Sequence, residues 1–271
     1  MTTTPTLLPD RPAPIGPALA KRGRIVAIAS GKGGVGKTWF AITLAHALSR
    51  QGRRVLLFDG DLGLANVDIQ LGLMPAHDLA TVLAGTRSLA QAVQHHAEGG
   101  FDILAGRSGS GALSALDDTA LEAVLATLRD AAARYDHVVL DLGAGIDRTT
   151  RRMSAFADLL LVLATEEPTS LTDAYAVLKL HHADRIAGEG ANGEARIVVN
   201  QAGNATSGER TYATLARACA AFLGHTPKLA GILRRDDRVR DAIRRQTLLL
   251  QRHPNATAAS DVERLVEGLL G

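Results

Sequence analysis

The sequence predicts an α/β fold with one doubly wound, mostly parallel sheet and helices on both of its faces. Two observations lead to this class. Short runs of β-branched residues and leucine occur without polar alternation, which indicates strands covered on both faces. These runs alternate with longer stretches whose apolar residues recur on a helical period. The 271 residues could hold one large domain or two small ones, and the unbroken alternation favours one.

The elements can be assigned in order along the chain. A buried strand is expected at residues 24–30, followed by a helix at 39–50. Further strands are expected at 54–59, 101–104, 137–141, 159–165, 196–200 and 228–233. Further helices are expected at 120–134, 170–182 and 212–223. Because the carboxyl ends of parallel strands share one edge of a sheet, the residues that follow those ends are expected to form the functional site.

The composition excludes several classes of protein. The formal net charge of +2 is too small to indicate nucleic-acid binding, although arginines cluster near the C-terminus. The single cysteine, Cys219, is expected to be a buried core residue, and one cysteine supports neither a disulfide nor a zinc or iron–sulfur site, so a cytosolic protein is favoured. The longest apolar run, residues 159–164, is far shorter than the roughly 20 residues of a membrane span. No signal peptide is visible in residues 1–20.

A phosphate-binding loop follows the first strand. Its sequence GKGGVGKT satisfies the pattern G-x-x-x-x-G-K-[ST] between a strand and a helix. Glycines allow backbone N–H groups to surround phosphate oxygens, and the helix N-terminus adds partial positive charge. Lys37 is expected to reach the β- and γ-phosphates, and the Thr38 hydroxyl to coordinate Mg²⁺. The residues expected to bind the nucleotide here are Gly31, Lys32, Gly33, Gly34, Val35, Gly36, Lys37 and Thr38.

Two acidic segments follow other strands. Asp59 and Asp61 leave the strand at 54–59 and enter a glycine-containing loop, a spacing that suits a Mg²⁺ shell and the orientation of an attacking water. Asp141 ends the strand at 137–141, where phosphate-loop enzymes usually carry an acidic residue that holds Mg²⁺ through water. Gly143 then allows a backbone N–H to sense a γ-phosphate.

Lys32 decides the subclass of this loop. It lies on the outer side of the loop, from which it cannot easily curl back onto phosphates bound there. The nucleotide of a second subunit docked face to face is its natural target. In that position a lysine neutralises charge that develops on the transferred phosphoryl group. A solvated loop lysine is the alternative.

Four separated motifs resemble those of the MinD/ParA group of deviant Walker A ATPases, and they occur in that family's order. Residues 32–38 are similar to the deviant Walker A motif itself. Residues 59–73, DGDLGLANVDIQLGL, resemble the switch I of the FlhG/FleN flagellar-number regulators in particular. Residues 141–146, DLGAGI, resemble their switch II, and residues 167–175 resemble their segment after the next strand. The resemblance spans about residues 24–250 and implies the P-loop NTPase fold.

The resemblance implies a homodimeric switch that binds ATP and Mg²⁺ and hydrolyses ATP slowly. By similarity, Asp61 positions the attacking water, and Lys32 and Lys37 act beside it in catalysis. The residues implied to support Mg²⁺ are Thr38, Asp59 and Asp141. Asn200, at the end of the strand 196–200, matches the family's adenine-contacting position, and its amide offers a donor and an acceptor to the base. A strand-end turn is the alternative for Asn200.

Trp39 departs from the family pattern, in which the residue after the loop threonine is small and polar. A hydroxyl contact to the α-phosphate is then absent, and the ring is expected to pack against the neighbouring helix or a ribose. Trp39 therefore counts among the nucleotide-binding residues. The N-terminal tail also lacks a clear version of the short glutamine-containing motif by which some members activate a signal-recognition-type GTPase.

Three segments are expected along the chain. Residues 1–22, rich in threonine and proline, form a disordered tail, residues 23–255 form the deviant Walker A ATPase domain, and residues 256–271 form an amphipathic helix. MinD-like proteins dock on membranes through such a helix. Here Asp261, Glu263 and Glu267 on its polar face would be repelled by anionic lipid. Packing of the helix on the domain is therefore favoured, and peripheral membrane contact stays the alternative.

The leading functional hypothesis is an ATP-hydrolysing dimerisation switch that regulates flagellar number or placement. It implies a partner from the flagellar assembly or regulatory machinery and a location in the cytoplasm or against the inner membrane face. The alternative is a ParA-like ATPase that binds nucleoid DNA and positions another cargo, through Arg234, Arg235, Arg238, Arg240, Arg244 and Arg245. A third hypothesis, a metabolic ligase of the same fold, lacks an acid–base constellation. The paired histidines, His95-His96 and His181-His182, are expected near helix ends in solvent.

Overall fold

The computed structural model describes residues 22–106, 117–188 and 193–270. The sheet order is β3-β4-β2-β5-β1-β6-β7-β8, and every neighbouring pair is parallel except β3 and β4. The strands are β1 (Arg24–Ser30), β2 (Val55–Gly60), β3 (Gln94–His96), β4 (Phe101–Leu104), β5 (His137–Ala144), β6 (Leu159–Ala164), β7 (Glu194–Ala202) and β8 (Lys228–Arg234). The predicted doubly wound, mostly parallel fold is confirmed. The predicted tail lies, apart from Arg22, outside the described residues.

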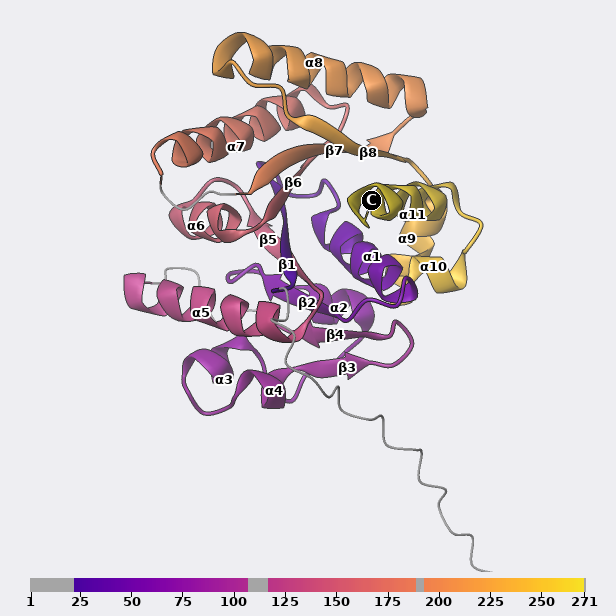
Figure 1. Ribbon diagram of the computed structural model, residues 1–271. Helices are drawn as coiled ribbons and strands as arrows, with labels where there is room; N and C mark the ends of the chain where they lie inside the picture. Colours follow the sequence, from indigo (N-terminus) through magenta and orange to yellow (C-terminus); the bar gives the residue numbers. More distant parts are fainter. Residues whose placement is uncertain (1–21, 107–116, 189–192, 271) are drawn as a thin grey trace, which may run out of the picture.

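Helices cover both faces of the sheet. They are α1 (Lys37–Arg50), α2 (Val67–Leu71), α3 (Leu79–Leu83), α4 (Leu89–Ala92), α5 (Asp118–Arg134), α6 (Arg148–Phe156), α7 (Pro168–Ile186), α8 (Ala205–Leu223), α9 (Asp237–Arg244), α10 (Leu249–Arg252) and α11 (Thr257–Leu270). Figure 1 shows α1 with α9, α10 and α11 on one side of the sheet and α5, α6 and α7 on the other. Each side has its own apolar core, and Cys219 of α8 is buried as predicted.

The expectation that the paired histidines lie in solvent is confirmed for His95, which is exposed, and is wrong for His181, which is buried. His95 and His96 lie in β3, the antiparallel edge strand, where the His95 ring contacts Asp102 and the His96 ring stacks on Phe101 at a centroid distance of 5.2 Å. His181 is buried within α7, with Nε2 3.2 Å from the carbonyl oxygen of Gly193. A three-residue polar edge strand carries no apolar period, which is why the sequence did not indicate it.

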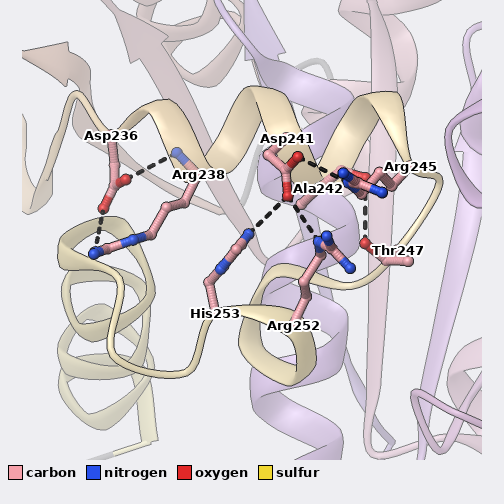
Figure 2. Close-up of polar contacts among 8 residues, drawn as sticks. All are labelled: Asp236, Arg238, Asp241, Ala242, Arg245, Thr247, Arg252 and His253. Carbon is pink, nitrogen blue, oxygen red and sulfur yellow. Dashed lines mark hydrogen bonds and ion pairs between the residues drawn. The ribbon is translucent and has the colours of Figure 1, made fainter.

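The short helices α9 and α10 are locked together by one carboxylate. Asp241 accepts hydrogen bonds from Arg245 (2.9 Å) and Arg252 (2.7 Å), and it lies 2.9 Å from Nε2 of His253 (Figure 2). Hydrogen bonds from Arg252, His253 and Arg245 hold the pKa of the Asp241 carboxyl well below its ordinary value. This network fixes the direction of α9, which begins beside the end of β8.

The C-terminal helix α11 packs against α1 and β8. Its apolar stripe faces the domain, because Val262, Leu265 and Val266 are buried. Asp261, only 3% exposed, accepts from the backbone N–H of Arg234 at 2.9 Å and from its guanidinium at 2.7 and 2.9 Å. A buried carboxylate that is paired in this way is costly to separate from its partner, so it ties α11 to the end of β8.

His46 is a buried imidazole in the middle of α1. Its ring faces Phe101 at a centroid distance of 6.4 Å, and Nδ1 has no hydrogen-bond partner among the described residues. Burial, together with the smaller effects of the charges of Arg50 and His96, lowers the pKa of His46 to about 4. The native state therefore keeps this imidazole neutral where an unfolded histidine, with a pKa of 6.5, already takes up a proton.

Replacing His46 by leucine should make the free energy of unfolding less dependent on pH on the acid side of neutrality. The pKa of His46 in the folded state lies below that in the unfolded state. The contribution of His46 to the free energy of unfolding is therefore fully present above pH 6.5 and is lost as the pH falls toward 4. The wild type should lose about 3 kcal/mol of unfolding free energy to this group over that interval, and His46→Leu should not. Urea unfolding at pH 7 and pH 4 measures the difference. His77→Gln, on the loop before α3, controls for removal of an imidazole, and equal pH slopes in wild type and His46→Leu would refute the assignment.

Candidate functional site

The loop between β1 and α1 has the backbone shape of a phosphate cradle. Gly34 and Gly36 adopt left-handed conformations, with φ of 80° and 91°, which few residues other than glycine take up at low cost. A Cβ on Gly36 would lie 2.7 Å from Nδ2 of Asn200, so the loop also needs glycine there for space. Gly36 caps α1, whose first-turn N–H groups point to the loop. The local shape therefore fits phosphate oxygens.

Lys37 points into the loop. Its side chain is buried, and Nζ donates to the Ser30 hydroxyl at 3.0 Å. Burial lowers the pKa of Lys37, and the carboxylates of Asp141 and Asp61 counteract that shift. A buried ammonium without a full counter-ion is a strong attractor for phosphate, so the predicted role of Lys37 is consistent with its position.

Two buried carboxylates stand side by side beneath the loop. Asp59 of β2 and Asp141 of β5 are in register on neighbouring strands, and each is 1% exposed. The pKa of Asp59 is raised to about 8 and that of Asp141 to about 7, with burial as the largest cause for both. The neighbouring Asp141 charge contributes to the raised Asp59 pKa, whereas hydrogen bonding from Thr38 and the Lys37 charge partly offset the rise of the Asp141 pKa. The pair concentrates negative charge where a cation would relieve it.

The residues present fit Mg²⁺ bound together with a nucleotide. Asp141 Oδ1 is buried and lacks a hydrogen-bond partner among the described residues, while the Thr38 hydroxyl is bonded to the same carboxyl group. Asp59 is more heavily engaged, since it accepts backbone N–H groups of Asp61, Asn66 and Val67 at 3.1 to 3.2 Å. In residues 22–106, 117–188 and 193–270, no cluster of three His, Cys, Asp or Glu forms a metal cage. Phosphate and water oxygens would therefore complete the shell.

Asp61 and Gly143 both line a cavity of about 250 Å³. The cavity is bounded by the loops that follow β2 and β5, including Gly60, Gly63 and Asp147. A Cβ on Gly143 would lie 3.3 Å from Asp61 Oδ1, so glycine allows the close approach. Asp61 Oδ1 also accepts the N–H of Leu64 at 3.0 Å, which fixes the orientation of the carboxylate. The predicted water-positioning residue and the predicted γ-phosphate sensor are thus neighbours.

Lys32 points away from its own loop. Its Nζ lies 2.7 Å from Glu167 Oε2 and 3.2 Å from the Thr169 hydroxyl, at the start of α7. The hydrogen bond from Lys32 lowers the pKa of Glu167. The Lys32 side chain is 40% exposed, and exposed ion pairs of this kind are weak and easily exchanged. The sequence did not predict these contacts, although Glu167 and Thr169 belong to the segment that resembles the family.

A second cavity, of about 300 Å³, opens beside the loop. It is lined on one side by Gly34, Gly36, Trp39, Asn200 and Gln201, and on the other by Arg234, Arg235, Asp236, Asp237, Val239, Arg240 and Ile243. Asn200 donates to the Val35 carbonyl at 2.7 Å and accepts the N–H of Gln201 at 2.9 Å, so it braces the loop while it faces the cavity. Gln201 adopts a left-handed φ of 56°, unusual for a residue other than glycine. The α9 wall was missed because only the tertiary fold brings it here.

The sequence is similar to proteins of known families. The profile described as the CobQ/CobB/MinD/ParA nucleotide binding domain matches residues 26–249. The antiactivator FleN of Pseudomonas aeruginosa is 34% identical over 236 residues, which cover 87% of this chain and 82% of FleN. The flagellum site-determining protein YlxH of Helicobacter pylori is 32% identical over 200 residues, covering 71% of this chain and 63% of YlxH.

Solved structures agree on the fold. The septum site-determining protein MinD of Pyrococcus horikoshii, complexed with Mg-ADP, superposes with a TM-score of 0.72 at 22% identity. The match covers 91% of this chain and 96% of that one. At this level of identity the similarity establishes the architecture alone, and it agrees with the sheet described above.

Removal of the Asn200 amide should weaken nucleotide binding. Asn200→Ala loses the brace on Val35 and the polar group that faces the cavity, and we expect ADP affinity to fall about tenfold, the effect of one lost hydrogen bond at a buried site. Titration calorimetry with Mg-ADP measures it. Asn204→Ala is the matched control, because Asn204 caps α8 through Ser207 and does not line the cavity. Unchanged ADP affinity in Asn200→Ala would exclude this role.

Proposed function

The chain belongs to the CobQ/CobB/MinD/ParA family of nucleotide-binding domains, and on that premise we propose an ATP-hydrolysing dimerisation switch that regulates flagellar number or placement. The observation that carries the proposal is the opposite direction of the two loop lysines. Lys37 Nζ points inward to Ser30, whereas Lys32 Nζ contacts Glu167 and Thr169 on the outer side. One lysine is therefore available for the chain's own nucleotide and the other for a second copy.

The proposed chemistry assigns each residue a separate task. The backbone N–H groups of the loop and Lys37 hold the phosphates of ATP. Mg²⁺, when bound with the nucleotide, neutralises phosphate charge, with Thr38, Asp141 and Asp59 as its support. Asp61 orients and polarises the attacking water beside Gly143, whose small size leaves room for both. Asn200 contacts the adenine.

Lys32 supplies the switch. In a face-to-face dimer, two phosphate-laden loops repel each other, and Lys32 from each copy relieves the charge on the other copy's nucleotide. The move requires exchange of the contact with Glu167, which is weak because both side chains are partly exposed. Dimerisation then depends on a bound triphosphate, and hydrolysis returns the protein to the monomer.

The flagellar role rests on the similarity to two proteins. FleN is named as an antiactivator, and YlxH is named as a flagellum site-determining protein. The partner would then be a protein of the flagellar assembly or regulatory machinery, reached from the cytoplasm. None of the described helices combines the length and hydropathy needed to cross a bilayer. Peripheral membrane contact through α11 is disfavoured, because its apolar residues Val262, Leu265 and Val266 pack inside the domain.

A ParA-like role on DNA is the second candidate. Arg235, Arg240 and Arg244 are exposed, which favours it. Arg234, Arg245 and Arg252 are instead paired with Asp261 and Asp241. The test is binding to nonspecific duplex DNA. Affinity that falls steeply between about 50 and about 200 mM salt would support this role over the flagellar one.

Hydrolysis should depend on the Asp61 carboxylate. Asp61→Ala cannot orient water, so turnover should fall at least about a hundredfold while ATP still binds, and the ATP-bound dimer should accumulate. Phosphate release and light scattering measure the two effects. Asp68→Ala is the control, because it removes a carboxylate from α2 in the same segment. Turnover of Asp61→Ala at the wild-type rate would contradict the assignment.

Alanine substitutions of Lys32 and of Lys37 should have different effects on nucleotide binding and dimerisation. Lys37→Ala should abolish nucleotide binding. Lys32→Ala should keep ADP affinity within about threefold of wild type and lose both ATP-dependent dimerisation and most hydrolysis, because the missing charge belongs at the partner's phosphates. ADP calorimetry, light scattering with a nonhydrolysable ATP analogue and turnover are the three measurements. Lys179→Ala, an exposed lysine on α7, is the control. Normal dimerisation and turnover in Lys32→Ala would refute the switch.

A further inference from the structure

An exposed apolar surface, here called the α7–α8 surface, lies where the helices α7 and α8 end. Ile186, the last residue of α7, is 75% exposed, and Phe222, the last but one of α8, is 78% exposed. The two helices lie side by side, and the Phe222 ring meets that of Tyr175 edge-on at a centroid distance of 6.4 Å (Figure 1). Large apolar side chains that stay in water at neighbouring positions mark a surface that another segment can cover.

The α7–α8 surface lies at the edge of the sheet away from the phosphate loop. α7 leads into β7 and α8 leads into β8, so both helices end at the amino ends of the parallel strands. The phosphate loop instead follows the carboxyl end of β1. The surface therefore has no part in the nucleotide site.

A cavity of about 260 Å³ lies within the α7–α8 surface. Its wall is formed by His182, Arg185 and Ile186 of α7 and by His225, which follows α8. The two imidazole rings stack at a centroid distance of 5.7 Å with an angle of 3° between their planes. This stack joins the end of α7 to the loop after α8 and gives the cavity a fixed aromatic wall.

The cavity wall carries a guanidinium that the described residues leave unpaired. Arg185 makes no ion pair with a carboxylate in residues 22–106, 117–188 and 193–270. The carboxylate that precedes it, Asp184, is buried and is paired with Arg151 instead. An apolar surface beside an unpaired guanidinium fits a segment that carries apolar side chains next to a carboxylate.

The sequence before β1 contains such a segment. Leu7 and Leu8 are adjacent, and Asp10, two residues later, is the single acidic residue among residues 1–21. Pro9 lies between them, and further prolines follow at 12, 14 and 17. Proline restricts the backbone before any contact forms, so less conformational entropy is lost on docking.

The point at which this segment joins the domain lies close to α7. The Arg22 guanidinium donates to Asp158, just before β6, at 2.5 Å. Gly193, just before β7, packs against Asp158, since a Cβ on Gly193 would lie 2.9 Å from the backbone carbon of Asp158. The Gly193 carbonyl oxygen in turn lies 3.2 Å from Nε2 of His181 on α7. The roughly 14 residues from Leu8 to Arg22 span about 40 Å when extended, so the segment reaches the α7–α8 surface.

We propose that residues 7–10 dock on the α7–α8 surface of their own chain. The two leucine side chains cover Ile186 and Phe222, and the Asp10 carboxylate enters the cavity and pairs with Arg185. Docking removes apolar area of both segments from water and gives the guanidinium its counter-ion. The α7–α8 surface is then a binding site for the N-terminal segment, separate from the nucleotide edge.

Disulfide trapping in the full chain tests the docking. Leu8→Cys is combined with Ile186→Cys in one protein and, as a control, with Ala213→Cys, an exposed position earlier on α8, in another. The native Cys219 is buried, and burial raises the pKa of its thiol, so it does not compete. The disulfide within one chain should form at least about tenfold faster with Ile186→Cys, because docking raises the local concentration of the tail thiol there. Equal rates would overturn the inference. A disulfide between two chains would overturn it too, because a second copy would then cover the surface.

The contact between Asp10 and Arg185 has its own test in the protein that carries Leu8→Cys and Ile186→Cys. Asp10→Arg should slow the trapping about threefold, the effect of one partly exposed ion pair, and Arg185→Asp should do the same. The two exchanges together should restore the rate, since they rebuild the pair with the charges reversed. A double exchange that stays as slow as the single ones would overturn the assignment of Asp10 to Arg185.

Nucleotide binding serves as the reference measurement for all of these variants. Mg-ADP affinity, measured by calorimetry, should equal that of the wild type in each, because the α7–α8 surface lies away from the phosphate loop. Failure of the docking is therefore distinguishable from failure of the proposed function.

Discussion

Two buried carboxylates in register at the centre of the sheet are the constraint on which the site depends. Asp59 and Asp141 lie opposite each other on the neighbouring strands β2 and β5, and burial makes both difficult to ionise. The protein offsets this cost only in part, through Lys37 and through backbone N–H groups that point at Asp59. A Mg-nucleotide would correct the remaining imbalance, because the carboxylates would attract its cation and the lysine would attract its phosphates. The parallel sheet makes the arrangement possible, because it brings both strand ends to one edge.

The Asp59 carboxylate also holds the loop that carries Asp61. Asp59 holds the start of the following loop through the N–H groups of Asp61, Asn66 and Val67, so a change in charge beside Asp59 acts directly on the segment that carries Asp61. On the other side, Gly145 donates its N–H to the Ser30 carbonyl at 3.0 Å, which joins the loop after β5 to the end of β1. Both loops are thus tied by hydrogen bonds to the edge of the sheet that carries the predicted phosphate loop.

The sequence predicted those parts of the fold and site that depend on local pattern. The continuous apolar strands, the phosphate loop and the acidic residues near strand ends all have a signal within a few residues. β1, β2 and β5 occur where expected, except that β5 continues past the predicted end at Asp141 to Ala144. The edge strand β3 and the buried His181 were missed, because one is short and polar and the other depends on packing between distant segments. The α9 wall of the nucleotide cavity was missed for the second reason.

The placement of α9 determines which arginines of the segment 234–245 are paired and which are exposed. From sequence, six arginines between positions 234 and 245 suggest one basic surface. In the fold, Arg234 is paired with Asp261 and Arg245 with Asp241. Part of the positive charge is therefore neutralised within the protein, where these pairs hold α9, α10 and α11 in place. Arg235 and Arg240 line the nucleotide cavity. Most of the segment therefore builds and lines the nucleotide end of the site, and the charge left for another polyanion is smaller than the composition suggests. Internal pairing of this kind cannot be read from a mixed-sign sequence, because it depends on which aspartates the fold brings into reach.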